Sequence, residues 1–346
     1  MRLLQYLKPA LTGLVFFIAG CEQPVQQQPL LQLSGPTMGS SYNLSLVAPA
    51  GGLPADAQQQ IDRLLADIDQ QFSTWRDDSE LARFNQQQGT EPVAVSSELV
   101  VVAREALRIG KLSDGALDVT VGPLLKLWGF DRHQQPEVLP DETAIAAVRA
   151  VTGLDKLQVT DSTFAKVIPP LSLDFSALVA GHAADRLASL IDGWGVNHYL
   201  LEVTGEMRVK GMHPASRPWR IAVEKPVAGG GRSVERVIEL RDIGVATSGD
   251  YRNFYEIDGQ RYSHTINPQS GKPIDHLMVS VTVLDPSAMT ADGWATALMA
   301  VGPEQAKQLA EQQRLAVLLI LKQDDAFIEW SSSAMAPYLT TINKED

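Results

Sequence analysis

Hydrophobic residues recur along the chain in two patterns, one with a helical period and one typical of strands. Spacings of three and four residues predict amphipathic helices over residues 54–72, 96–112 and 141–151. Short apolar runs flanked by turn residues predict strands over 31–47 and 157–168. The first half of the chain therefore mixes both kinds of element.

The second half continues this mixture. A strand leads into a long helix over residues 171–192, and a strong strand over 279–284 leads into a helix over 290–299. Further elements are expected as strands at 199–209, 219–223, 237–240, 245–251, 316–321 and 327–330, and as a helix at 302–313. Helices interspersed with such strands indicate an α+β fold, with a mostly antiparallel sheet core and flanking helices.

The N-terminus has the pattern of an export signal. Arg2 and Lys8 accompany an apolar run over residues 11–20, which is too short to span a bilayer. The run ends in Ile18-Ala19-Gly20-Cys21, which resembles the bacterial lipobox and would make Cys21 the lipidated first residue of the mature protein. An ordinary signal peptide with an incidental cysteine is the alternative.

The lipobox interpretation divides the chain into three parts. Residues 1–20 are expected to be a lipoprotein signal peptide. Residues 21–33, rich in Gln and Pro, are expected to be a flexible tether. One folded domain is expected over residues 34–340.

Composition narrows the classes of function. The 346 residues carry a formal net charge of -12, which argues against a nucleic-acid surface and against adhesion to anionic lipid by basic patches. Phosphate ligands stay open, because a divalent cation can supply positive charge locally. Cys21 is the only cysteine, so the folded domain has no disulfide framework and no cysteine-based metal or redox site.

The helix over residues 290–299 carries the most suggestive polar pair. We expect Thr290 to be its N-cap. Asp292 and Thr296 stand four residues apart and share one helix face. A carboxylate and a hydroxyl near a helix N-terminus suit a hard cation and phosphate. By themselves the two residues favour a simpler interpretation, a capped first turn and a threonine packed against the core.

Other candidates are equally ambiguous when each is taken alone. Trp75, in a loop, can stack on a flat ligand or cap the core. Asp174 stands at the start of a helix, where it can favour phosphate or act only as a cap. The strand over 199–209 contains polar side chains that need partners, in a site wall or a structural network. His264, before a turn, is by itself more typical of a structural histidine than a catalytic one.

Seven motifs in order resemble those of the ApbE family of FAD:protein FMN transferases, over residues 34–335. They are Thr37-Met38-Gly39-Ser40-Ser41-Tyr42, Phe72-Ser73-Thr74-Trp75, Ala116-Leu117-Asp118-Val119-Thr120-Val121-Gly122-Pro123, Leu173-Asp174-Phe175-Ser176-Ala177, Thr247-Ser248-Gly249-Asp250-Tyr251, Ser263-His264-Thr265-Ile266-Asn267-Pro268 and Ala291-Asp292-Gly293-Trp294-Ala295-Thr296.

The resemblance implies a set of site residues. Those implied to contact FAD are Met38, Trp75, Ala116, Leu117, Asp118, Asp174, Ala180, His264 and Thr265. It implies a Mg²⁺ site formed by Asp292, Thr296 and the main-chain carbonyl of Ala177. His264 and Asp292 are the expected catalytic residues, with Asp250 or a residue of the acceptor as alternative bases.

The chain departs from the family pattern at three places. Many members have Lys-Gly-Tyr where this chain has Ala180-Gly181-His182, which would shift phosphate binding towards the metal and backbone amides. Trp75 replaces a frequent Tyr, a tolerable change for stacking. Thr204 replaces one glycine of the pair that usually precedes the acid at Glu206.

The resemblance also implies an activity and its partners. FMN would move from FAD to a Thr or Ser hydroxyl of a target protein, and AMP would leave. Candidate acceptors are flavoprotein subunits of sodium-pumping NADH–quinone reductase or related electron-transfer complexes. The protein is expected to be a membrane lipoprotein facing the periplasm, on the inner membrane. Two alternatives are an Mg²⁺-dependent FAD pyrophosphatase and a non-catalytic FAD-binding lipoprotein.

Overall fold

The computed structural model describes residues 29–131, 136, 138–226, 232–249, 254–324 and 326–339. Side chains are described in these ranges except at 224–226 and 232–235. The predicted signal peptide, Cys21 and most of the predicted tether lie outside the described residues. Asp250 and Tyr251 of the fifth motif also lie outside them.

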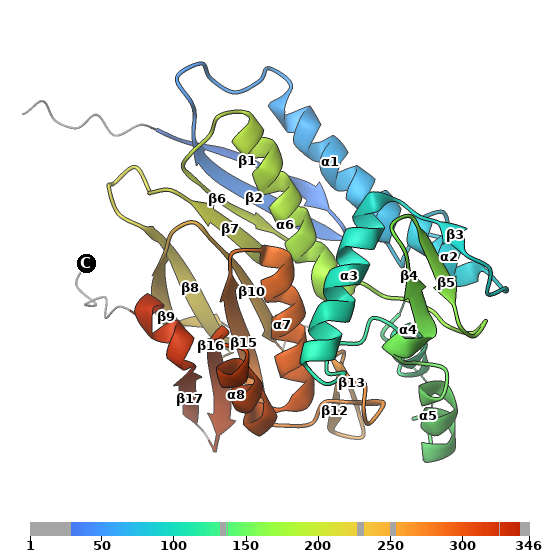
Figure 1. Ribbon diagram of the computed structural model, residues 1–346. Helices are drawn as coiled ribbons and strands as arrows, with labels where there is room; N and C mark the ends of the chain where they lie inside the picture. The colour runs from blue at the N-terminus through green and yellow to red at the C-terminus, as the bar shows by residue number, and fades with distance from the viewer. Residues whose placement is uncertain are drawn as a thin grey trace, which may run out of the picture.

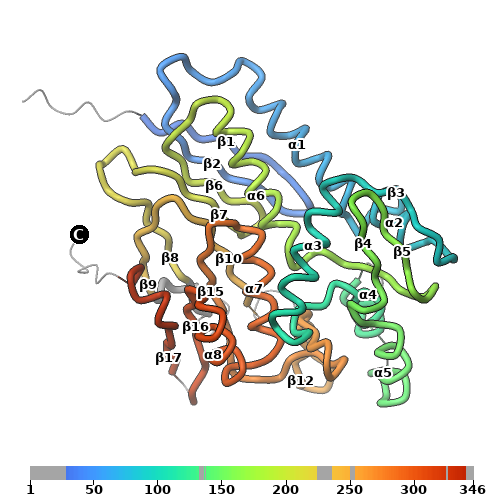
Figure 2. Tube along the Cα trace, viewed as in Figure 1, coloured from blue at the N-terminus to red at the C-terminus, as the bar shows by residue number. Residues whose placement is uncertain are grey.

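An eight-stranded sheet forms the centre of the domain, in the order β1-β2-β6-β7-β10-β15-β16-β17, and every neighbouring pair is antiparallel (Figure 1). Its strands are β1 (Leu30–Thr37), β2 (Ser40–Val47), β6 (Tyr199–Val203), β7 (Glu206–Lys210), β10 (Ile243–Gly249), β15 (Met278–Asp285), β16 (Ala316–Gln323) and β17 (Ala326–Ser331). The first and last strands of the chain thus form opposite edges of one sheet, as the trace in Figure 2 shows. The predicted α+β fold with an antiparallel core is confirmed.

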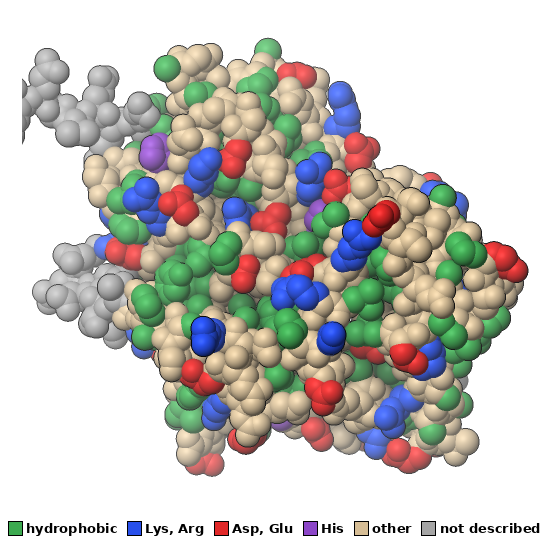
Figure 3. Space-filling view, viewed as in Figure 1, with side chains coloured by type: hydrophobic (Ala, Val, Ile, Leu, Met, Phe, Trp, Pro, Cys, Tyr) green, Lys and Arg blue, Asp and Glu red, His purple; other side chains and the backbone are tan. Residues whose placement is uncertain are grey.

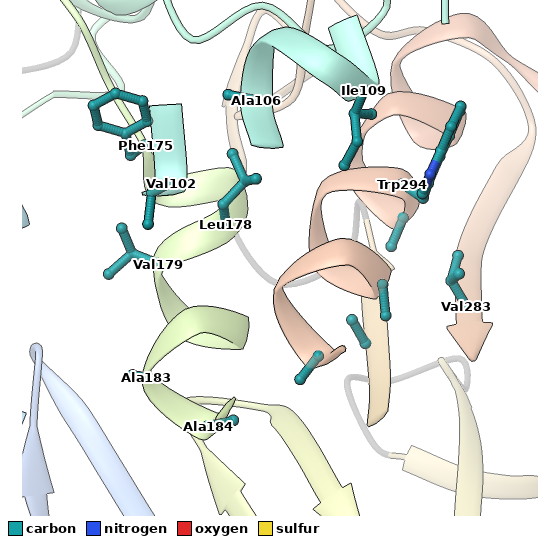
Figure 4. Packing of buried hydrophobic residues seen from close by; sticks show 14 of the residues in the cluster. Val102, Ala106, Ile109, Phe175, Leu178, Val179, Ala183, Ala184, Val283 and Trp294 are labelled. Carbon is teal, nitrogen blue, oxygen red and sulfur yellow. The ribbon is translucent and has the colours of Figure 1, made fainter. Parts of the chain in front are cut away.

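Helices cover one face of this sheet. They are α1 (Ala57–Phe72), α3 (Ser97–Leu112), α6 (Ser176–Gly193), α7 (Ala288–Val301) and α8 (Pro303–Gln312). Their apolar faces meet in the main core, where Val102, Leu178 and Trp294 come from three different helices (Figure 4). Of these helices, α7 is the most deeply buried, and almost every residue from Ala291 to Ala300 is inaccessible. A helix that is apolar on all sides is expected to be enclosed.

The opposite face of the sheet is covered by the ribbon of β8 (Trp219–Pro226) and β9 (Arg232–Leu240), over a second apolar cluster. A third, smaller cluster joins α4 (Gly122–Leu127) and α5 (Glu142–Arg149) to the hairpin of β11 (Phe254–Ile257) and β12 (Gln260–Ser263). The remaining elements are α2 (Glu80–Gln86), β3 (Val93–Ala94), β4 (Leu157–Val159), β5 (Thr163–Lys166), β13 (Ile266–Asn267), β14 (Lys272–Pro273) and two short 3-10 helices, Leu154–Lys156 and Ser333–Tyr338.

Three local predictions were wrong. No strand leads into α6, because the backbone of residues 171–175 forms no regular element and bonds to the Asn85 side chain and the Val119 carbonyl instead of to a partner strand.

Thr290 is not the N-cap of α7, because the helix begins earlier and Ser287 accepts the capping bond from the N–H of Thr290 at 3.2 Å. The stretch 199–209 is not one strand but the β6–β7 hairpin. Thr204 and Gly205 form its turn with positive φ angles of 54° and 120°, a conformation that glycine adopts without strain.

The surface is consistent with the acidic composition. Acidic and basic side chains are interspersed over the helix-covered face in Figure 3, with no large basic field on that face. Within the described ranges, no helix has the length and apolar character needed to cross a bilayer.

Candidate active site

The site is built around the contact between α6 and α7. Gly181 of α6 lies against the first turn of α7, and a Cβ atom there would come within 2.3 Å of the Ala288 carbonyl oxygen. The absent side chain lets the two helices touch backbone to backbone. This close approach allows the N–H of Gly181 to donate a hydrogen bond to Oδ2 of Asp292, at 3.1 Å.

The carbonyl of Ala177 stands one turn before Gly181 in α6. In a regular helix the N–H of residue 181 would bond to the carbonyl oxygen of residue 177. A carbonyl oxygen has two lone pairs, so the Ala177 oxygen can accept a helix bond and still contact another electropositive partner. This is the carbonyl that the sequence resemblance implies as a metal ligand.

A carboxylate from α6 fixes the start of α7. Asp185 accepts bonds from the Ser287 hydroxyl at 2.6 Å and from the N–H groups of Ala288 and Met289 at 3.0 and 3.1 Å. Arg208 of β7 lies 3.4 Å from the same carboxylate. A negative charge that binds the free N–H groups of a helix start stabilises that helix, so Asp185 sets the position of α7 relative to α6.

Asp292 is a buried carboxylate beside a second acid. Its exposed fraction is 6 %. Burial raises the pKa of Asp292 well above its usual range, the charge of Glu206 on β7 raises it further, and the bond from Gly181 opposes the rise. Two acids in one poorly hydrated place repel each other, so a bound cation would relieve both the desolvation and the repulsion.

Hydroxyl groups lie in the same region, which we call the polar corner and which consists of Asp292, Glu206, Thr204, Ser248 and Thr296. The Thr296 hydroxyl lies 3.3 Å from that of Ser248 on β10, and Thr204 lies 3.5 Å from Glu206. Within the described ranges, no three His, Cys, Asp or Glu side chains converge as a metal cluster. The donors are therefore hard oxygens of mixed type, which suit Mg²⁺ when phosphate oxygens and water fill the remaining positions. We conclude that these residues fit the implied ion.

A cleft of about 370 Å³ opens beside this corner, and ten of the predicted site residues line it together. They are Ala116, Leu117, Asp118, Asp174, Ala177, Ala180, His264, Thr265, Asp292 and Thr296. They come from four segments that are far apart in the sequence, 116–118, 174–180, 264–265 and 292–296. Their shared position is a finding of the structure, and the individual roles implied by the resemblance remain predictions.

Asp118 lies on the wall formed by the loop before α4. Burial raises the pKa of the Asp118 carboxyl, against the hydrogen bonds from the Thr120 hydroxyl at 2.6 Å and its N–H at 2.8 Å. These bonds hold the carboxylate of Asp118 in one orientation. Ala116 and Leu117 beside it are almost fully buried, so they contribute mainly backbone to the cleft.

Asp174 lines the central cleft and also two neighbouring pockets of the surface. Its carboxylate accepts the N–H of Ser176 at 2.8 Å, although the α6 N-cap position itself is Phe175. The chain before it is fixed by Asn85, whose side chain bonds both the N–H and the carbonyl of Leu173 at 2.8 Å. The buried ammonium of Lys166 binds the carbonyl oxygen of Asn85 at 2.9 Å. Asp174 is therefore held in place by residues from α2 and β5.

Met38 and Trp75 lie outside the central cleft, in an adjoining pocket of about 580 Å³. The pocket shares Asp174, Ala180 and Thr204 with the cleft. Met38 has a φ of 44° in the β1–β2 turn, and the side chain of Trp75 is 67 % exposed. A long ligand could thus extend from the polar corner to an exposed aromatic face.

His264 and Thr265 follow β12 and line the cleft. The N–H of Thr265 bonds the Ser263 hydroxyl at 3.2 Å, and its carbonyl accepts the N–H of Ile274 at 3.0 Å. His264 also lines a third hollow, so it stands between the cleft and the surface.

Sequence reasoning missed several supporting residues. Asp185, Asn85 and Lys166 act on the site through contacts with α7 and with the chain before α6. Ser248 lay inside a recognised motif, but its contact with Thr296 spans 48 residues. The one local signal was the polar face of α6, where Asp185 follows Gly181 by four residues.

Comparison with known proteins gives a consistent result. The model of the ApbE family matches residues 38–319. A protein of Vibrio cholerae serotype O1 named FAD:protein FMN transferase is 47 % identical over 327 residues, covering 94 % of this chain and 97 % of its own. A protein of Escherichia coli K12 with the same name is 39 % identical and covers 98 % and 99 % of the two chains.

Solved structures resemble the whole described domain. The flavin transferase ApbE from Vibrio cholerae superimposes with a TM-score of 0.83 at 46 % identity, covering 90 % of this chain and 99 % of that one. The Pseudomonas stutzeri flavinyl transferase ApbE in its apo form gives a TM-score of 0.82 at 37 % identity, with 92 % and 99 % covered.

Proposed function

This chain belongs to the ApbE family, and we infer from its membership and its site that it is an FAD:protein FMN transferase. We propose further that the transfer depends on Mg²⁺ and that the acceptor is a Thr or Ser hydroxyl. The observation that carries the metal dependence is the buried Asp292, held by Gly181 and facing Glu206 at the end of a cleft.

The proposed reaction is phosphoryl transfer at the FAD pyrophosphate. The acceptor oxygen forms a bond to the phosphorus of the FMN half, and the bond from that phosphorus to the bridging oxygen breaks. AMP leaves with the bridging oxygen, and the hydroxyl proton passes to a base. The product is a phosphoester-linked flavin.

The residues of this chain would position the groups and balance their charge. Asp292, Thr296 and the Ala177 carbonyl would hold Mg²⁺, which supplies charge neutralisation to the phosphate oxygens when it is bound. The start of α6 near Ala177 and Ala180 would lie next to the phosphates, since a helix N-terminus favours anions, and Asp174 would hold the adenosine or ribose side. His264, between the cleft and the surface, is placed to take or relay the acceptor proton.

Mass spectrometry of an acceptor protein tests this function. The folded domain, incubated with FAD, Mg²⁺ and the acceptor, should produce an FMN adduct on a Thr or Ser. The adduct should be lost in Asp292→Ala. Release of FMN and AMP without an adduct would instead identify an FAD pyrophosphatase. Stable FAD binding without turnover would identify a binding protein.

We propose two further properties. The acceptor is expected to be a flavoprotein subunit of sodium-pumping NADH–quinone reductase or of a related electron-transfer complex. Lipidation at Cys21 would place the domain on the periplasmic side of the inner membrane. Labelling with radioactive palmitate should occur in the full chain and disappear in Cys21→Ser; unchanged labelling would contradict the lipid anchor.

A further inference from the structure

A large groove continues from the reaction cleft onto the surface. It holds about 880 Å³ and shares Asp174, Ser176 and His264 with the cleft. Its walls come from the Trp75 loop, α2, α4 with the residues that follow it, and β11. The groove is thus the wide outer continuation of the place where the pyrophosphate would react.

Given the transferase function proposed above, we propose that this groove binds an extended segment of the acceptor protein and presents its Thr or Ser hydroxyl at the His264 end. Three features of the groove carry this proposal: its exposed aromatic lining, the edge of β11 that is unpaired within the described residues, and walls that line neither of the pockets implied for FAD.

The groove exposes aromatic surface on a firmly held support. Phe254 at the start of β11 is 43 % exposed. Behind it Tyr255 stacks on Phe130 with ring centroids 5.0 Å apart and donates its hydroxyl proton to the Trp128 carbonyl at 2.9 Å. Trp75, which is 67 % exposed, also lines the groove, so the groove presents two exposed aromatic side chains of the kind enriched at protein-binding surfaces.

The β11 edge offers main-chain hydrogen-bonding groups. Within the described residues β11 pairs only with β12, in a two-stranded sheet. An extended peptide can add a strand to such an edge, where backbone bonds supply affinity and pockets for alternate side chains supply selectivity. A segment bound in this way would run along Phe254 and Tyr255 towards the cleft.

Part of the groove also lies outside the pockets implied for FAD. Phe254 and Lys126 line the groove but neither the central cleft nor the pocket of Met38. Trp75, by contrast, lines both the groove and the Met38 pocket. Substitutions at Phe254 and Lys126 can therefore separate acceptor binding from FAD binding.

The test uses the purified protein and the flavin-free acceptor subunit of a sodium-pumping NADH–quinone reductase as the probe. Phe254→Glu and Lys126→Glu change two different walls of the groove. Ile328→Glu is the control, because Ile328 is an apolar residue of a strand with a similar exposed fraction of 45 % and does not line the groove. For each variant we would measure the Kd for the acceptor, the Kd for FAD and the rate of adduct formation.

The proposal predicts that Phe254→Glu weakens acceptor binding by about tenfold, equivalent to about 1.4 kcal/mol. Lys126→Glu should also weaken it, Ile328→Glu should not, and all three should keep the Kd for FAD within about twofold. Unchanged acceptor binding in both groove variants would overturn the proposal, as would an equal loss of FAD affinity. If the unmutated protein binds the acceptor but forms no adduct, the proposed function fails while the binding constants still decide the groove.

Discussion

The inner and outer parts of the site are built in opposite ways. The inner part, where α6, α7 and β10 meet, is closely packed. Both Gly181 and Gly244 lie so near Ala288 that a Cβ atom on either would clash with its backbone. The outer part, formed by the Trp75 loop and the β11–β12 hairpin, leaves Trp75 67 % and Phe254 43 % exposed.

We infer from this difference that the proposed chemistry belongs to the inner part and the proposed recognition to the outer part. A phosphoryl transfer needs oxygen ligands fixed to within a fraction of an ångström, and close backbone packing supplies that precision. Recognition of a flavin ring or a protein segment needs accessible area instead. We therefore expect substitutions in the inner part to abolish turnover, and those in the outer part to weaken binding.

The largest expected effect comes from Gly181→Ala. The new methyl group would push α7 away from α6, so we expect a loss of about 1–3 kcal/mol in the free energy of unfolding and at least about a hundredfold lower turnover. Gly193→Ala in the same helix meets no atom within 4 Å and should leave both nearly unchanged. Thermal melting and adduct formation measure the two effects, and normal activity in Gly181→Ala would contradict the inner packing described above.

A smaller loss is expected from Asp185→Ala. Without its carboxylate, the first N–H groups of α7 lose their partner, which should cost about 0.5–2 kcal/mol. The Mg²⁺ concentration for half-maximal activity should rise, because Asp292 moves with α7. Asp192→Ala is the control on the same helix, since Asp192 pairs with Lys210 and with the Tyr199 hydroxyl rather than with α7. An unchanged Mg²⁺ requirement in Asp185→Ala would show that α7 is positioned by other contacts.

The third prediction concerns the pH dependence of stability near the inner part. Burial lowers the pKa of His182, although Glu98 of α3, 2.8 Å away, and Asp185 raise it and Arg186 lowers it. A histidine with a lowered pKa binds fewer protons in the folded than in the unfolded state, so stability falls as the pH drops below about 6.5.

Melting curves at pH 5 and 7.5 measure this dependence. The Tm of wild type should be lower at pH 5 than at pH 7.5. In His182→Gln, which lacks the titrating imidazole, this difference in Tm should be smaller by a few °C. His198 is exposed, and His198→Gln should leave the difference in Tm between the two pH values unchanged. An identical pH dependence of Tm in wild type and His182→Gln would disprove that His182 causes the loss of stability at low pH.

The smallest effect on stability is expected at the rim. Trp75→Ala should leave Tm within about 1 °C, because the side chain is 67 % exposed and contributes little to the core. Loss of an aromatic stacking partner should raise the KM for FAD by about three- to tenfold, whereas Trp75→Tyr should retain stacking. An unchanged KM in Trp75→Ala would exclude a stacking role.

Much of the fold could be predicted because its determinants are local. The amphipathic period of α1 and α3 and the apolar runs of β15 and β16 follow directly from the sequence. The same holds for Asp292 and Thr296, whose common helix face follows from their spacing. The β6–β7 turn was missed, because Thr204 at a position with positive φ is an uncommon choice of residue.

The supporting contacts could not be predicted, because they depend on how distant segments pack. Asp185 caps a helix that begins 103 residues later, and Asn85 holds a backbone segment 88 residues away. Neither residue differs locally from an ordinary helix-surface side chain. Only the packing of α6 on α7, and of α2 against the segment before α6, reveals their partners.

Titration of Mg²⁺ into the FAD-loaded protein tests most directly the claim that the inner part holds the ion. The wild-type domain should bind one Mg²⁺, and Asp292→Asn, which keeps the shape of the side chain and an acceptor for the Gly181 N–H, should weaken that binding by at least about a hundredfold while still binding FAD. The same Mg²⁺ affinity in wild type and Asp292→Asn would contradict the claim and place the metal elsewhere.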